Sequence, residues 1–209
     1  MKFSISEVNV ANVYCITHQD SKMLARMFMR LQEHYESSNI EFRNKPFSRD
    51  EFKTWYAANQ SESGTFSYYS DWSGFNIPSN IVHQFRMGDW GELHELELKL
   101  LKLTENLQEP YYLIGVADDS DLVLEHEIAH GLYYTNETYR TEVNNILGRY
   151  RFTELYNRLR DMGYGDNVLL DEVHAYLVAD EDWLHEEGIS YPMYLAVELQ
   201  VLYNNTLED

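Results

Sequence analysis

The stretch VLEHEIAHGL, residues 123–132, carries two histidines, His126 and His130, four positions apart in an apolar sequence. Its spacing of apolar residues predicts a helix. Residues four apart lie on the same face of a helix, so both imidazoles can point toward one metal ion from a rigid support. Glu127 follows the first histidine, where its carboxylate can meet a water bound to that ion and take its proton. This stretch therefore predicts a metal centre with a general base beside it.

The rest of the sequence predicts strands early in the chain and mostly helices after residue 120. The segment 61–80 is rich in turn residues and aromatic residues, and we expect a loop there with one strand at most. Ser48 is expected to cap a short helix, with Glu51 completing a capping box. The strands are expected at 13–17 and 111–117, and the other helices at about 21–36, 89–103, 120–134, 137–147, 151–162, 168–179 and 191–203. This pattern indicates an α+β fold that is mostly helical, with a small β-sheet.

Composition and charge limit the function. The 209 residues are 44% hydrophobic and contain no linker-like tract, so we expect a single domain over residues 1–209. Lys and Arg total 16 against 35 Asp and Glu, for a net charge of −19. This charge disfavours direct binding of nucleic acid or of an anionic membrane surface. Cationic partners, metal ions and mimicry of nucleic acid are compatible with it.

Cysteine content and hydropathy give the expected location. A single cysteine, Cys15, excludes an intramolecular disulfide and a cysteine-rich metal site. The longest apolar run, residues 111–117, is far shorter than a membrane span, and the N-terminal residues lack the apolar region of a signal peptide. We therefore expect a cytoplasmic protein without a membrane partner.

A third metal ligand is expected because catalytic zinc usually takes three protein ligands and a water. Glu172 stands in the predicted helix NVLLDEVHAYLVAD, among apolar residues one turn away on either side. A carboxylate on an apolar face is costly to bury unless it meets a cation. Two other residues of this helix, Asp171 and His174, are three apart. They are alternative ligands in place of Glu172, or a solvated surface pair, and Asp171 is also a candidate partner for a ligand imidazole's other nitrogen.

The segment 123–132 resembles the extended pattern of the zincin metallopeptidases, in which the positions between and beside the histidines are uncharged. It departs from the metzincin form, because Tyr133 and Asn136 stand where that family has its glycine and third histidine. Glu172, followed by alanines at 175 and 179, is similar to the second ligand helix of gluzincins, where the alanines let the two helices approach closely.

This resemblance implies a zincin-like metallohydrolase domain that holds Zn²⁺ through His126, His130 and Glu172 and cleaves a peptide or protein substrate. Glu127 would act as general base and then as acid. The resemblance also implies an edge strand beside the substrate cleft, for which the segment 111–117 is the candidate, although its continuous apolar run suits a central strand equally well.

Further expectations concern the substrate and the other function classes. Tyr176 and Tyr191 are candidates to stabilise the oxyanion of the transition state. The acidic stretches 118–121 and 180–182 are expected to be solvated faces, and 118–121 would also favour a cationic substrate side chain. One alternative is an acidic interaction protein, or nucleic-acid mimic, whose histidine pair is a structural or vestigial metal site. Another is a metal hydrolase that acts on a non-peptide amide.

Overall fold

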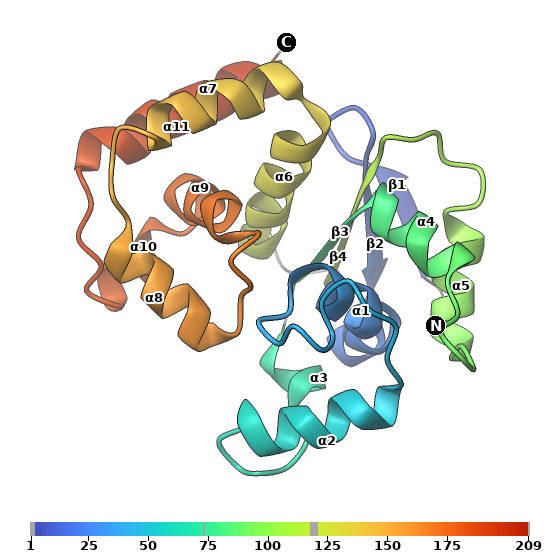
Figure 1. The fold of residues 1–209 in the computed structure, drawn as a ribbon. Helices are drawn as coiled ribbons and strands as arrows, with labels where there is room; N and C mark the ends of the chain where they lie inside the picture. The colour runs from blue at the N-terminus through green and yellow to red at the C-terminus, as the bar shows by residue number, and fades with distance from the viewer. Residues whose placement is uncertain (1–2, 73, 118–120, 209) are drawn as a thin grey trace.

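A four-stranded mixed sheet lies between two groups of helices in the computed structural model, which describes residues 3–72, 74–117 and 121–208 (Figure 1). The strands are β1 (Ser4–Glu7), β2 (Val13–His18), β3 (Gly74–Pro78) and β4 (Tyr112–Ala117), in the order β1-β2-β4-β3. β2 and β4 are parallel, whereas β1 pairs with β2, and β3 with β4, in antiparallel fashion. The predicted α+β class, mostly helical with a small sheet, is confirmed.

Alternating side chains of the sheet enter two separate cores. Tyr112, Ile114 and Val116 of β4 pack with the helices of the C-terminal half, whereas Leu113, between Tyr112 and Ile114, packs with the N-terminal helices. The N-terminal group is α1 (Ser21–Glu36), α2 (Arg49–Asn59), α3 (Tyr68–Asp71), α4 (Ser79–Met87) and α5 (Glu95–Leu103). The C-terminal group is α6 (Asp121–Thr135), α7 (Glu137–Leu147), α8 (Thr153–Met162), α9 (Leu169–Ala179), α10 (Glu181–Glu186) and α11 (Met193–Glu208). No helix in the described part of the chain is long and apolar enough to cross a membrane.

Capping residues explain where two of the helices begin. The predicted capping box of α2 is present, since Ser48 accepts a hydrogen bond from the Glu51 amide and the Glu51 carboxylate accepts one from Ser48. The helix predicted over 89–103 begins only at Glu95. His94 caps it, and the preceding Gly91 has a positive φ of 64°, which a helix does not accommodate. Segment 89–94 is therefore an irregular loop, and the predicted start of the helix is wrong by more than one helical turn.

The position of β4 corrects the edge-strand interpretation of segment 111–117. β4 lies between β2 and β3, and five of its six residues are buried, so it is a central strand. β3 is the strand at the end of the sheet order, on the side of β4 away from β2. Three helices and one strand among the described residues were not predicted: α3, α4, α10 and β1.

α6 crosses the sheet and packs against α9, as Figure 1 shows. Small residues allow both contacts. Ala129 of α6 and Ala175 of α9 are fully buried. A Cβ on Gly131 would come within 2.7 Å of the Val13 side chain in β2, so glycine allows the helix to lie directly on the sheet. This packing positions one face of α6 opposite one face of α9.

Candidate metal centre

Three side chains converge between α6 and α9. Nε2 of His126 and Nε2 of His130 lie 3.1 Å apart. Oε1 of Glu172 lies 3.5 Å from His130 Nε2, and Oε2 lies 3.7 Å from His126 Nε2. In a tetrahedral zinc site with bonds near 2.05 Å, neighbouring ligand atoms are about 3.3 Å apart. The three predicted ligands therefore stand at the separation that zinc would require.

Little of these three side chains is exposed, which distinguishes them from the exposed acidic groups that are common on proteins without a metal ion. The exposed fractions of the side chains are 12% for His126, 1% for His130 and 2% for Glu172. Oε2 of Glu172 makes no hydrogen bond to any described residue. A buried carboxylate oxygen with no donor is costly, and a cation between the three side chains would remove that cost.

Each imidazole has Glu172 on its Nε2 side and a second carboxylate on its Nδ1 side. Oδ2 of Asp180 accepts a hydrogen bond from Nδ1 of His126 at 2.5 Å, and Oδ2 of Asp171 lies 3.0 Å from Nδ1 of His130. A proton on Nδ1 leaves the lone pair of Nε2 free to bind a metal, and the carboxylate fixes the orientation of the ring. Histidines that ligate metals in proteins almost always have such partners.

The alternatives to Glu172 occupy other positions. Asp171 is near His130 from the Nδ1 side, and its side chain is 13% exposed. His174 is fully buried, with Nε2 2.6 Å from the Tyr139 hydroxyl and Nδ1 3.6 Å from Asp171. The expectation of a solvated surface pair is therefore wrong, because α9 is covered by α6, α7 and α11. Neither residue belongs to the group that could hold one ion together with the two histidines.

The same contacts shift the pKa values of the three candidate ligands. Burial alone would lower the pKa of His126, but the nearby carboxylates of Asp180 and Glu172 outweigh burial and raise that pKa to about 9. The pKa of His130 is likewise raised well above its ordinary value, because Asp171 and Glu172 outweigh burial. Burial raises the pKa of Glu172, but the two imidazoles outweigh it and lower that pKa. The carboxylates around the two imidazoles therefore favour positive charge between α6 and α9, and a divalent ion would supply that charge.

Glu127 lies beside the three converging side chains and faces β3. It is 5% exposed, and its Oε2 has no hydrogen-bond partner among the described residues. A Cβ on Gly74 would meet Oε1 of Glu127 at 2.2 Å, so a side chain at this position would displace the carboxylate. Burial raises the pKa of Glu127, and it outweighs the opposing effects of the imidazoles and of a hydrogen bond from Asn76. A raised pKa suits a general base that works near neutral pH.

Asn76 is a site residue that the sequence did not indicate. It lies on β3, and its Oδ1 accepts a hydrogen bond of 2.5 Å from the hydroxyl of the fully buried Tyr112. This bond orients the amide so that its nitrogen can donate to Glu127. An isolated asparagine in a turn-rich segment gave no signal for this role.

Asp180 is the second residue that sequence analysis missed. The acidic stretch at 180–182 was interpreted as a solvated face, but Asp180 ends α9 and bonds His126. Its distance of eight positions from Glu172, close to two helical turns, was the available signal. The acidic stretch 118–121, expected to attract a cationic substrate, lies outside the described side chains.

A small cleft of about 270 Å³ opens beside His126 and Glu127. Tyr176 lines it, with its ring centroid 4.9 Å from that of His126. Tyr191 instead bonds Glu181 and does not line the cleft, so it is not placed to assist there. The other lining residues are Asp71, Trp72, Gly74, Val123, Met162, Tyr164, Asp180 and Trp183.

We compared the chain with protein-family models, with curated proteins and with solved structures. No family model, no curated protein and no solved structure matches this chain. The resemblance to zincins therefore rests on the sequence motif.

Asp171→Asn is expected to lower zinc affinity by about 10- to 100-fold, because the amide no longer attracts the proton on Nδ1 of His130 as a carboxylate does. Competition with a chromophoric chelator measures this affinity. Asp166→Asn is the matched control, since its side chain is 73% exposed and pairs with Arg160 instead. Equal zinc affinity in the two variants would show that Asp171 does not support the site.

Proposed function

We propose that this chain is a zinc-dependent hydrolase that cleaves peptide bonds. The observation that carries the proposal is the convergence of His126 Nε2, His130 Nε2 and the Glu172 carboxylate, with the Glu127 carboxylate beside them. Carbonyl addition of water needs an electrophile, a base for the water and a donor for the leaving nitrogen. Zinc would be the electrophile, and Glu127 would serve both as the base for the water and as the donor for the leaving nitrogen.

Zinc, when bound, would supply a Lewis acid that polarises the carbonyl group and acidifies the attacking water. His126, His130 and Glu172 would hold it. Glu127 would accept the proton of the attacking water on its unpartnered Oε2 and then deliver it to the leaving nitrogen. The raised pKa of Glu127 supports both roles, because the same group must bind and release the proton.

Tyr176 supports the proposal as a candidate donor to the developing oxyanion. It lines the cleft next to His126, and its hydroxyl is bonded to Tyr164. Burial raises the pKa of Tyr176 well above its ordinary value, so the phenol stays protonated and can donate a hydrogen bond.

The peptide substrate is supported by the place of β3. This strand ends the sheet order, and Gly74 lies against Glu127. The backbone amide of Asn76 already donates to Gln32, so an extended peptide would pair with β3 near Gly74, where its carbonyl groups would pass the carboxylate. The acidic-interaction alternative has less support, since the carboxylates around the two imidazoles face them rather than an exposed surface.

Incubation of the zinc-loaded chain with a mixed peptide library is expected to produce new peptide termini, which mass spectrometry detects. The metal chelator 1,10-phenanthroline should abolish cleavage, whereas its non-chelating 1,7 isomer should not. Added zinc should restore cleavage after the chelator is removed. Full zinc occupancy without any cleavage of the library would remove the peptide bond as the substrate and favour another amide.

A further inference from the structure

A cationic cavity of about 600 Å³ lies on the side of the sheet that carries α1, and none of the three candidate metal ligands lines it. Four of the 16 Lys and Arg residues of the chain line it, although the chain carries a net charge of −19. They come from α1 (Arg26 and Arg30) and from α2 (Arg49 and Lys53). Acidic chains repel anions in general, so such a concentration of cations is a local exception.

The floor of the cavity is a buried ion pair. Arg30 donates two hydrogen bonds to Glu97, of 2.8 and 2.6 Å, and both side chains are almost fully buried. Arg30 also donates to the carbonyl oxygens of Phe47 and Trp90. Its donors are thus largely satisfied, and it serves as a rigid support rather than as a free cation.

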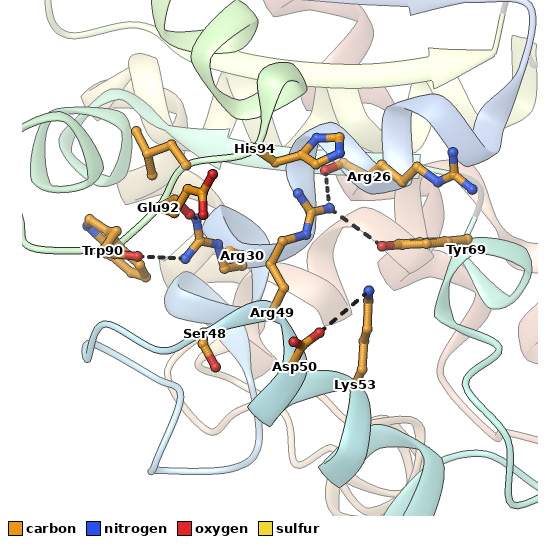
Figure 2. A pocket seen from close by; sticks show the side chains of 12 residues that line it. Arg26, Arg30, Ser48, Arg49, Asp50, Lys53, Tyr69, Trp90, Glu92 and His94 are labelled. Atoms are coloured by element: carbon orange, nitrogen blue, oxygen red, sulfur yellow. Dashed lines mark hydrogen bonds and ion pairs between the residues drawn. The ribbon is translucent and has the colours of Figure 1, made fainter.

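Arg49 adds a second guanidinium beside the same carboxylate. Its Nη1 lies 3.6 Å from Glu97 Oε1, beyond hydrogen-bond distance, and it makes no hydrogen bond to any residue that the structure describes. Its Nη2 donates to the carbonyl oxygen of Arg26 at 3.1 Å and to the Tyr69 hydroxyl at 3.5 Å. Figure 2 shows Arg49 held in this way between Arg30 and Lys53. These contacts hold the guanidinium at the wall of the cavity, with the buried Nη1 turned toward Glu97.

The remaining cations are weakly neutralised. Nζ of Lys53 lies 3.9 Å from Asp50, whose side chain is 97% exposed, and such exposed pairs contribute little. The Arg26 guanidinium lies over the ring of Tyr69, 5.2 Å from its centroid. The pKa of His94, which also lines the cavity, is lowered by burial and then by Arg49. The local field is therefore positive.

We propose that this cavity binds the phosphate group of a small hydroxylated phosphate monoester, such as a sugar phosphate, through the positively charged groups of Arg49 and Lys53. A guanidinium and an ammonium together match the charge and the several acceptor oxygens of a phosphate dianion. The cavity exceeds the size of phosphate alone and falls in the range of small-molecule sites. Asp50 and Glu92 also line it, and their carboxylates would accept hydrogen bonds from hydroxyl groups of the ligand.

Calorimetric titration of the full chain with glucose 6-phosphate tests this proposal. EDTA is present, so that divalent ions do not bind the phosphate, and ionic strength is held constant. The ester is expected to bind with one site per chain, inorganic phosphate more weakly, and glucose without measurable heat. Citrate is the carboxylate probe and is expected to bind more weakly than the ester. No binding of the ester, or equal affinity for citrate, would overturn the proposal.

Arg49→Gln is expected to weaken binding of glucose 6-phosphate at least about tenfold, because a charge-assisted hydrogen bond is lost. Lys53→Gln, which leaves the Arg30–Glu97 pair untouched, is expected to weaken it several-fold and covers the case in which the first variant fails to fold. The matched control is Arg151→Gln, which removes an exposed arginine that does not line the cavity. If the control weakens binding as much as either variant, the attraction is non-specific and the assigned site is wrong.

Discussion

Replacement of Glu127 by Gln is expected to leave the zinc content of the chain unchanged and to lower peptide turnover by about 10²- to 10⁴-fold. Glutamine has the shape of glutamate but cannot accept a proton from water. The side chain stands beside the ligand group and is not one of its members, so the metal site should stay intact. Initial rates of library cleavage and metal analysis of the same samples measure the two effects.

Glu125→Gln is the matched control for this experiment. Glu125 is exposed on the same helix, two positions earlier, and does not line the cleft. We expect this variant to retain wild-type turnover and zinc content. Undiminished turnover of Glu127→Gln would remove Glu127 from its role as base. A loss of zinc in Glu127→Gln would instead make Glu127 part of the metal site.

The convergence of the two candidate ligand histidines could be predicted because it depends only on their spacing within one helix. A spacing of four in a helix places His126 and His130 on one face whatever the rest of the chain does. Glu172 was predictable for a different reason, since a carboxylate on an apolar helix face must find a cation when that face is buried. In the structure Glu172 faces both imidazoles. The start of α2 was equally local, because Ser48 and Glu51 cap each other.

Features that depend on distant parts of the chain were not predictable from one sequence. The order of strands decides whether β4 is central or at the edge, and β4 proved central because β3 pairs on its other side. Asp180 was taken for a surface residue because its partner, His126, is 54 positions away. Asn76 needs both Tyr112 and Glu127 beside it to have a role. Tertiary contacts of this kind leave no periodic pattern in the sequence.

Replacement of His126 by Ala is expected to remove most of the bound zinc, since one of three ligands is lost and the two that remain bind zinc far more weakly. Glu172→Ala should have the same effect, because no other described carboxylate belongs to the ligand group. His83→Ala is the control, as this side chain is 60% exposed and lies outside the group. Each variant is loaded with zinc, passed through a desalting column and checked for folding by circular dichroism.

Metal analysis of these samples by inductively coupled plasma mass spectrometry tests the central claim, that His126, His130 and Glu172 together bind one metal ion. We expect one zinc ion per chain in the wild type and in His83→Ala, and less than about a tenth of that in His126→Ala and Glu172→Ala. Wild-type chain without zinc, or equal zinc content in the wild type and in folded His126→Ala, would contradict the metal centre and the hydrolase proposal that depends on it.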